Sequence, residues 1–445
     1  MRKCFFIILI LFSVQSKVHA QKIFGLKDCI LYGLENHRSV VIKNNEKGIA
    51  KAATKEVRAG YLPSISLNAG IDDNLKVQEQ ILPAGLFGDK DMKVAFTKQY
   101  TTSGTIQLDQ KIYDPALIIS LKTNKFNLKK SELDADINDE EVIYNITSSY
   151  YQIMVYQHQK NFLTQNQDIY KEQVRIAKLQ VDKGVLAEVE LYKLQVSYNN
   201  TISQLRLCEK NISNSTNILK DAMGFPIEND LNVKTNSFKE NTQPYLIPQE
   251  EKFVVEKRTD YQLAQVDAAI QEMEYKKIRS GYLPTFTFYA KYGLNGFGDK
   301  LVESFNSLND FSSIGVKLSV PIFDGLSRRS QIQQAKLKYQ NTLETLKLDE
   351  SKFKMESENA KTKLAEAQTS IDEETENVAL AEKVLEITGL QYKKGIVDMT
   401  EWLNAQSSLK ESQNNFLNSI VNWYVAKVDL EKANGTIKTF YNDLN

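Results

Sequence analysis

Glycine and proline are scarce in this chain. Its 445 residues include 19 glycines and 8 prolines, about half the share that is usual in globular proteins. Proline is absent from the 110 residues between Pro115 and Pro226 and from the 124 residues that follow Pro321. Because both residue types interrupt helices, these two stretches are predicted to be mainly long helices.

Histidine, cysteine and an excess of either charge are also lacking. Three histidines and three cysteines are too few and too scattered for a metal cluster. The balance of 56 basic and 56 acidic residues argues against a nucleic-acid binder, and 42% hydrophobic with 25% charged residues argues against disorder. No nucleophile elbow, Walker loop or two-histidine helix motif occurs, and Gly296–Asp299 is expected to be a hairpin loop. We therefore predict no enzyme activity, no metal, no cofactor and no nucleic-acid partner.

Long apolar runs are missing except at the N-terminus. Arg2 and Lys3 precede an apolar run from Cys4 to Phe12, and a small residue, Ala20, ends the segment. Residues 1–20 are therefore predicted to be a secretory signal peptide. No segment approaches the roughly 18 apolar residues that a membrane-spanning helix requires, so export without a helical anchor is expected. Cleavage would remove three basic residues and no acid, leaving a net charge of about −3.

The chain contains two copies of one internal repeat. Three landmarks recur in the same order, at offsets of 221, 210 and 211 residues: Gly60–Ser64 as Gly281–Thr285, Ile112–Asp114 as Ile322–Asp324, and Lys183–Val185 as Lys394–Ile396. The change of offset indicates an insertion of 11 residues in the first copy, in an exposed loop around Leu82–Gly85. The predicted division is a first repeat at 21–224, a linker at 225–249, a second repeat at 250–435 and a tail at 436–445.

Each copy is predicted to hold a helix, two strands and two long helices in that order. The first helix ends at the Gly-Tyr-Leu-Pro signal, because glycine and a following proline terminate helices. Helices are predicted at 26–59, 115–183, 250–280 and 325–394, with a returning helix of about 40 residues after each long one. Strands are predicted at 64–71, 105–109, 285–288 and 313–320, where polar and apolar residues alternate.

Alternation gives each strand one apolar and one polar face. A half-buried sheet in a soluble protein is the commoner interpretation of this pattern. Segments of about ten residues, aromatic residues near the strand starts and an export signal favour an outer-membrane barrel instead. Four strands cannot close a barrel, because single-chain barrels begin at about eight strands and an open edge in lipid leaves backbone groups without hydrogen bonds. If these strands span a membrane, several chains must share one barrel.

The returning helices carry a seven-residue repeat. Large residues recur at Trp402, Leu409, Phe416, Trp423 and Leu430, each followed three positions later by a small residue. A shift of 211 residues finds the same seam in the first copy, from Leu191 to Leu219. The period indicates left-handed coiled-coil packing. Cys208 lies on this seam, so a buried thiol is expected rather than a disulfide with Cys29.

The predicted helix lengths indicate how the helices of each copy are arranged. A helix of some 70 residues reaches roughly 100 Å, whereas a returning helix of about 40 residues reaches roughly 60 Å. The first helix of each copy has about the missing length. We therefore expect it to stack end to end on the returning helix.

These features together resemble the TolC-like outer-membrane efflux proteins, over about residues 26–435. The most specific segments are Gly60–Ile65, Val320–Gly325 with Arg328 and Arg329 after it, and Tyr392–Gly395 followed by Trp402–Gln406. The resemblance implies a mainly α-helical fold with a membrane β part. Three chains with four strands each would form one twelve-stranded transmembrane β-barrel, continued by a long α-helical barrel across the periplasm.

The resemblance also implies a function and partners. It implies a homotrimeric, passive channel of an efflux or type I secretion system, embedded in the lipid of the cell outer membrane of a Gram-negative-type bacterium. The channel would dock onto a periplasmic adaptor, or membrane fusion, protein that is linked to an inner-membrane transporter. The cargo stays open among drugs, metal ions, lipids and proteins. The alternative from another class is a periplasmic coiled-coil scaffold or adaptor-like protein that is not inserted in the membrane.

In the resembled family, two helix-to-helix turns form the periplasmic tip. The corresponding residues are Gly184, Val185, Leu186, Gly395, Ile396 and Val397. A chain that reverses between packed helices favours glycine, which readily takes a positive φ. An ordinary turn without a partner explains either triplet alone, whereas the same Lys-Gly-aliphatic pattern in both copies favours docking.

The family also narrows its entrance with acidic side chains just past the second turn. The corresponding positions are Glu401 and Asn404 in the second copy and Glu190 and Lys193 in the first. Only the nearer position is acidic in each copy, and the family's basic partner is replaced by Val397. Threefold symmetry would gather six carboxylates, which favour cations in a narrow mouth. The alternative is that both glutamates are solvated charges in a first helical turn.

Overall fold

The structure is a computed structural model that describes residues 23–82, 84, 92–234 and 253–444. The expected signal peptide at 1–20 and parts of the expected insertion and linker lie outside these residues. The chain divides into two compact units, each described by itself. We call them the tip unit (Met1–Asn45, Leu133–Gln262 and Leu348–Asn445) and the sheet unit (Glu46–Glu132 and Leu263–Lys347).

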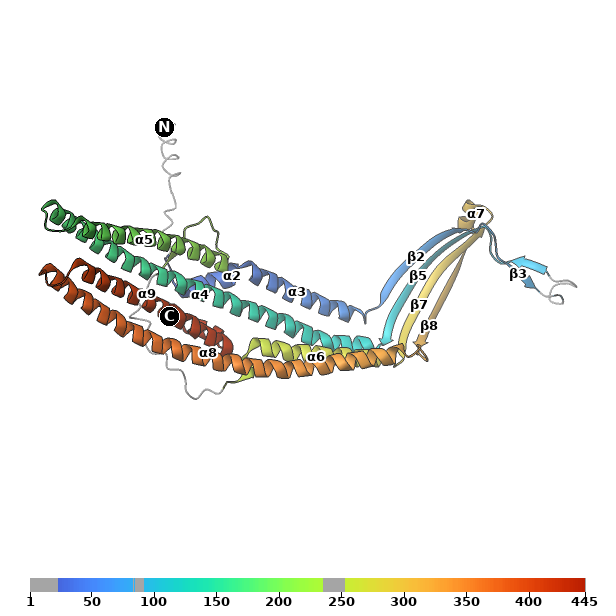
Figure 1. Cartoon of the computed structure of the whole chain (residues 1–445). Helices are drawn as coiled ribbons and strands as arrows, with labels where there is room; N and C mark the ends of the chain where they lie inside the picture. Colours follow the sequence, from blue (N-terminus) through green and yellow to red (C-terminus); the bar gives the residue numbers. More distant parts are fainter. Residues whose placement is uncertain (1–22, 83, 85–91, 235–252, 445) are drawn as a thin grey trace, which may run out of the picture. The chain divides into compact units, whose positions relative to one another are not determined.

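The sheet unit contains one four-stranded antiparallel sheet in the order β2-β5-β7-β8 (Figure 1). Its strands are β2 (Ser64–Asp73), β5 (Tyr100–Tyr113), β7 (Thr285–Gly298) and β8 (Leu308–Ser319). All four predicted strands are confirmed and are longer than expected. β2 and β8 are the edge strands of the sheet. A second hairpin, β3 (Glu79–Leu82) with β4 (Met92–Ala95), lies in the first copy at the predicted insertion.

The connection between β7 and β8 differs from the prediction. Gly296–Gly298 are not in a hairpin loop but form the last residues of β7, and the short helix α7 (Leu301–Asn306) follows. A methyl group on Gly296 would lie 1.8 Å from the carbonyl oxygen of Ser304. These glycines lie at the end of a strand, where the absence of a side chain lets α7 pack against the sheet. The sequence alone predicts loop residues here, because glycine is common in loops.

The two faces of the sheet differ sharply in polarity. The register aligns Leu67 with Ile106, Ile106 with Tyr292 and Tyr292 with Ser312 on one face. The large exposed apolar residues of the face that carries Leu67 are Ile65, Leu67, Ile71, Ile106, Tyr292, Leu308, Ile314, Val316 and Leu318. The next row of aligned residues lies on the other face and consists of Ser66, Gln107, Lys291 and Ser313. The predicted alternation is confirmed.

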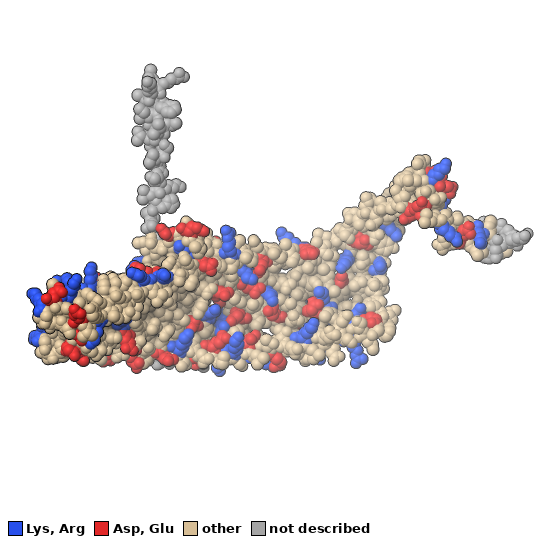
Figure 2. All heavy atoms as spheres, turned by 45° about the horizontal axis from the view of Figure 1, so that its top comes forward, with Lys and Arg blue, Asp and Glu red and all other residues tan. Residues whose placement is uncertain are grey.

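Two long helices and four shorter ones form the repeated helical framework. The long ones are α4 (Pro115–Asp182) and α8 (Ser327–Lys393), as predicted. The returning helices α5 (Glu188–Met223) and α9 (Met399–Asn434) have 36 residues each, and α3 (Arg38–Ala59) and α6 (Thr259–Ser280) have 22 each. Helices α3, α4, α6 and α8 contribute residues to both units. Lysine, arginine, aspartate and glutamate are interspersed over the helices on the face drawn in Figure 2.

The predicted end-to-end stacking is confirmed within the tip unit. α5 ends at Gly224 and α9 ends at Gly435, both with positive φ. A methyl group on Gly224 would lie 2.9 Å from the Cα atom of His37, which precedes α3. One on Gly435 would lie 2.9 Å from the Cα atom of Arg258, which precedes α6. Each returning helix therefore abuts the start of a short helix, at equivalent places in the two copies.

The first helix of copy one is not continuous, which corrects the prediction for 26–59. It is divided into α2 (Leu26–Asn36) and α3 at His37, whose backbone is extended. The imidazole Nδ1 of His37 accepts a hydrogen bond from the amide of Ser39 at 3.3 Å. Copy two has a related interruption, because a 3₁₀ turn (Val255–Lys257) precedes α6, which begins at Thr259 rather than at residue 250.

The linker and the tail contain more structure than predicted. β1 (Ile23–Phe24) pairs in parallel with β6 (Asn232–Val233) inside the expected linker. The expected tail forms α10 (Ile437–Asp443), and Ile437 is fully buried in a cluster with Cys29 and Val428. The tail is therefore part of the packed core of the tip unit.

The predicted coiled-coil seam is confirmed by burial. Trp402, Leu409, Trp423 and Leu430 are buried on α9, and Phe416 packs against the core that contains Trp423 and Leu430. In copy one the small residues of the seam, Thr201, Cys208 and Ser215 among them, are buried on α5. Cys29 and Cys208 are both buried and are not joined in a disulfide.

Candidate functional site: the two helix-to-helix turns

The turns between α4 and α5 and between α8 and α9 share one backbone geometry. Gly184 and Gly395 have φ values of 70° and 71°. The amide of Val185 donates to the carbonyl oxygen of Gln180 at 2.8 Å, and the amide of Ile396 donates to that of Gln391 at 2.9 Å. These bonds define the Schellman motif, in which a left-handed glycine satisfies the last carbonyls of a helix. The predicted positive φ at both glycines is confirmed.

Apolar side chains at these turns are open to solvent. Val185 is 75% exposed and Ile396 is 66% exposed, whereas Leu186 and Val397 are half-buried. The residue after a Schellman glycine commonly packs back on its own helix. Here it points away, so each turn presents one aliphatic side chain that the chain itself leaves uncovered.

One apolar cluster joins the two turns. Leu191 and Leu194 of α5 pack with Met399 and Trp402 of α9, and Leu186 packs against the same group. The Trp402 ring makes edge contact with Tyr170, with ring centroids 6.0 Å apart. The exposed turn residues therefore stand on a common buried base formed by both copies.

The predicted entrance residues differ from one another in their surroundings. The ammonium group of Lys193 donates to the Glu190 carboxylate at 2.8 Å and to the Thr400 hydroxyl at 3.3 Å. The side chains of Glu401 and Asn404 are exposed, one helical turn apart at the start of α9. The negative charge of Glu190 is therefore offset within the chain by Lys193.

Sequence reasoning treated Lys193 only as a departure from the family pattern. The structure gives it a specific position, linking the first turn of α5 to the first turn of α9. The spacing of three residues between Glu190 and Lys193 on a helix is a signal that could have found this pair. A second missed residue is Asp398, whose carboxylate accepts from the amide of Glu401 at 2.9 Å and caps α9.

Burial and charge at the base of the turns affect one tyrosine. Burial, together with the nearby Glu190 carboxylate, raises the pKa of Tyr392 above its ordinary value. The Tyr392 ring also lies near Trp402, with centroids 6.4 Å apart. The phenol therefore stays neutral at physiological pH, and the ring acts as part of the apolar base.

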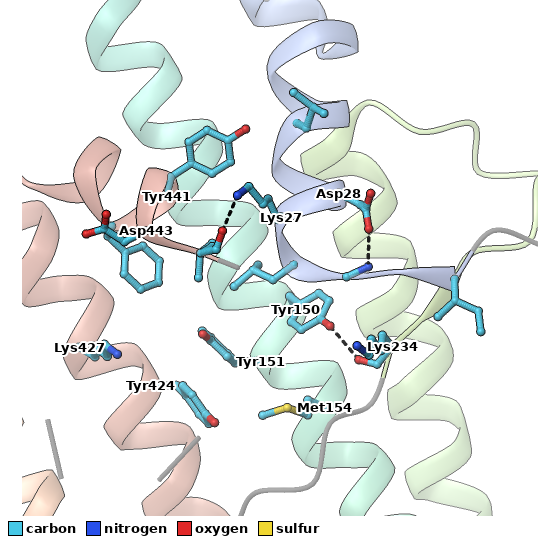
Figure 3. A pocket seen from close by; sticks show the side chains of 16 residues that line it. Lys27, Asp28, Tyr150, Tyr151, Met154, Lys234, Tyr424, Lys427, Tyr441 and Asp443 are labelled. Carbon is cyan, nitrogen blue, oxygen red and sulfur yellow. Dashed lines mark hydrogen bonds between the residues drawn. The ribbon is translucent and has the colours of Figure 1, made fainter. Parts of the chain in front are cut away.

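A cavity of about 800 Å³ lies elsewhere in the tip unit, among α2, α4, α9 and α10 (Figure 3). The Tyr150 hydroxyl donates to the carbonyl oxygen of Lys234 at 2.7 Å, and the Lys27 ammonium donates to that of Leu444. Burial lowers the pKa of Lys427 at its edge. The first bond joins α4 to the segment after β6, and the second joins α2 to the end of α10, so the cavity marks a packing junction of the framework.

Two further observations concern the described residues only. Among them, no group of three or more histidine, cysteine, aspartate or glutamate side chains is placed to hold a metal ion. No helix in the described part of the chain is both long enough and apolar enough to cross a membrane.

Comparison with known proteins decides the family. A family model described as outer membrane efflux protein matches residues 34–225 and 255–436, the parts of the chain that hold the two copies. The chain belongs to this family. The predicted resemblance is therefore confirmed, and the protein is an outer-membrane efflux or secretion channel rather than a periplasmic scaffold.

Individual relatives are distant but cover most of the chain. Outer membrane protein TolC of Vibrio cholerae is 20% identical over 409 residues, which are 91% of this chain and 89% of that protein. Proteases secretion protein PrtF of Dickeya chrysanthemi is also 20% identical, over 89% of this chain and 87% of its own length. The crystal structure of CusC is similar in fold, with a TM-score of 0.77 at 16% identity, covering 92% of this chain and 91% of that one.

Proposed function

We propose that three copies of this chain form the complete channel, with twelve strands in one barrel. The unpaired edges of β2 and β8 support this, since exposed edges in lipid would leave backbone groups without hydrogen bonds. Four strands are also fewer than the roughly eight with which known membrane barrels begin. In this arrangement each repeat, 21–224 and 250–435, supplies two strands of the barrel and one turn of the tip.

The face that carries Leu67 would meet lipid and the opposite face would line the channel. The apolar residues of the first face are exposed in the single chain, although burying each of them is worth about 1.5–3 kcal/mol. Lipid contact would cover them without any further protein. The polar residues of the other face, such as Gln107 and Lys291, would then meet water in the lumen.

The two turns would form the docking site for a periplasmic adaptor protein that connects to an inner-membrane transporter. The observation that carries this proposal is the pair of exposed side chains, Val185 and Ile396, on matching Schellman turns over one buried base. Gly184 and Gly395 set the backbone, and Leu186 and Val397 would complete the contact. An exposed apolar side chain on a rigid turn suits insertion into a pocket of a partner.

The introduction of negative charge at the turns tests docking. Val185→Glu with Ile396→Glu should abolish efflux or secretion in cells while leaving the protein in the outer-membrane fraction. The conservative pair Val185→Ile and Ile396→Val should keep activity, because the apolar contact is retained. Full activity of the glutamate variant, with normal outer-membrane levels, would contradict docking through these side chains.

The entrance would be narrowed by Glu190, Glu401 and Asn404 on α5 and α9. Because Lys193 offsets the charge of Glu190, the field at the mouth would come mainly from Glu401, repeated three times around the axis. In planar bilayers, Glu401→Gln should reduce cation preference more than Glu190→Gln does. Asn404→Asp should increase it. Equal reversal potentials in all variants would contradict an electrostatic entrance.

A further inference from the structure

The short helix α7 is fastened to the sheet by unusual close packing. Carbon atoms added to Gly296 and Gly298 would lie 1.8 Å and 2.5 Å from backbone atoms of Ser304. Ser304 itself is fully buried, and its hydroxyl lies 2.7 Å from the Thr102 hydroxyl and donates to the carbonyl oxygen of Leu301 at 2.7 Å. The two glycines therefore form a notch in β7 that holds the backbone of α7.

The notch lies on the apolar face of the sheet. Side chains on one face of a strand recur every second residue, and the register aligns Gly296 with Thr102 and Leu308. Thr102 in turn aligns with Ile71, which belongs to the apolar face defined by Leu67. α7 therefore covers the face that would meet lipid and leaves the polar face open.

α7 presents apolar side chains outward from this position. Val302 is 70% exposed, and Leu301 and Phe305 are 44% and 47% exposed. Charged groups flank them, since Lys98 pairs with Asp299 at 2.9 Å and the Glu303 carboxylate accepts from the amide of Asp299. Figure 2 shows charged atoms of both signs gathered beside the helix. Apolar residues bordered by charges are typical of helices that lie in a membrane interface.

The level of α7 along the strands matches that of an interface. From Leu318 to Leu308, β8 rises by about 33 Å, which a tilt of roughly 40° reduces to about 25 Å, the height of an outer-membrane apolar band. On edge strand β2 the apolar face also ends here, because Asp73 occupies it and aligns through Tyr100 with Gly298 at the end of β7. α7 therefore lies at the far boundary of the band, at the end of the strands away from the long helices (Figure 1).

The position of α7 across the sheet indicates that it contacts lipid and not a second copy of the chain. α7 packs on β7 and β5, which are the two central strands. Neighbouring copies would join at the edge strands β2 and β8. The exposed side of α7 thus faces outward from the middle of each chain's part of the barrel.

We infer that α7 is an interfacial anchor, which places Leu301, Val302 and Phe305 in the boundary between headgroups and acyl chains of the outer leaflet. The inference rests on the proposed barrel. It gives the glycine notch a role, because the notch fixes the depth and direction of these side chains. The partner is lipid, and the contact would set the vertical position of the channel in the membrane.

Depth-dependent quenching tests the inference. The variants Val302→Cys, Ile314→Cys and Lys291→Cys are labelled with a polarity-sensitive fluorophore in the full-length protein. They are reconstituted in phosphatidylcholine vesicles that carry a spin label either near the headgroup or deep in the chain. Unsubstituted protein, whose Cys29 and Cys208 are buried, gives the labelling background.

The probe at Val302 should be quenched more by the shallow label than by the deep one, and the probe at Ile314 more by the deep one. The probe at Lys291 should be quenched by neither. Quenching at Ile314 without quenching at Val302 would overturn the anchor and leave the barrel intact. Lack of quenching at both positions would instead contradict the proposed barrel.

A notch variant gives an independent test of the same role. Gly296→Val, combined with Val302→Cys, should displace α7 and abolish the shallow quenching while the probe at Ile314 is unaffected. Unchanged quenching at Val302 in this variant would show that the notch does not position the helix, and would overturn the inference.

Discussion

The stacking of helices in the tip unit makes a quantitative prediction about two glycines. Gly395 and Gly435 have the same φ, 71°, so alanine costs about 1–2 kcal/mol of conformational energy at either position. At Gly395 the added methyl group meets no atom within 4 Å. At Gly435 it would lie 2.7 Å from the carbonyl oxygen of Lys257 and 2.9 Å from the Cα atom of Arg258. Relief of such crowding between backbones typically costs a further 1–3 kcal/mol or so.

Gly435→Ala should therefore lower the stability by about 2–5 kcal/mol and Gly395→Ala by about 1–2 kcal/mol. Thermal unfolding followed by circular dichroism in detergent measures the two shifts, at one protein concentration because the assembly is expected to be oligomeric. The pair Gly224→Ala and Gly184→Ala repeats the comparison in the first copy, where the same contrast exists. Equal shifts within each pair would refute the close end-to-end contact of the stacked helices.

Three further changes probe the framework. Ile420→Ala removes a fully buried side chain on α9 and should cost about 2–5 kcal/mol in thermal unfolding; a loss below about 1 kcal/mol would contradict a closely packed seam. Arg258→Lys loses the paired hydrogen bonds to Asp260 and the bond to Glu356, and should lower the melting temperature. The loss should be smaller than in Arg258→Met, which removes the cation beside Asp260 and leaves Glu356 only the Lys352 ammonium group at 3.8 Å. Burial raises the pKa of Glu140, so the native state binds this proton more tightly than the unfolded state does. The contribution of Glu140 to the free energy of unfolding therefore falls as the pH rises above the ordinary pKa of a glutamate. Glu140→Gln should thus stabilise the protein near pH 7 and lose that advantage in acid; a pH-independent difference in melting temperature would argue against this origin.

The long elements could be predicted because their signals are local and repeated. The seam from Trp402 to Leu430 recurs in the first copy, and its buried residues follow directly from a seven-residue period. The turn at Gly395 was predictable for a similar reason, since few other residues accept the required φ. The duplication added weight to every such signal, because two sites had to agree.

The elements that were missed depend on contacts distant in sequence. No glycine or proline at His37 signals the interruption in the sequence. The interruption occurs where Gly224, at the end of α5, lies against the backbone of His37. The tail was expected to be irregular, yet Ile437 is buried by residues from α2 and α9. Its neighbours Phe440 and Tyr441 follow at helical spacing, which could have indicated α10.

Candidate site residues were predictable in identity but not in environment. Spacing from the turn glycines located Glu190 and Glu401 at equivalent places. Only the structure shows that the Glu190 carboxylate is paired with Lys193 while the Glu401 side chain is exposed. The net charge at the proposed entrance therefore depends on side-chain geometry, which a spacing rule does not contain.

The central claim is that the sheet of one chain is completed by two other copies. Cysteine in place of Ser66 on edge strand β2, combined with cysteines placed singly at positions 313–319 of edge strand β8, tests it by oxidation in intact outer membranes. At the matching register, denaturing gels should show cross-linked dimers and trimers and no larger species, because three chains close the ring. Monomers at every position, or a ladder that continues beyond three, would contradict a barrel shared by three chains.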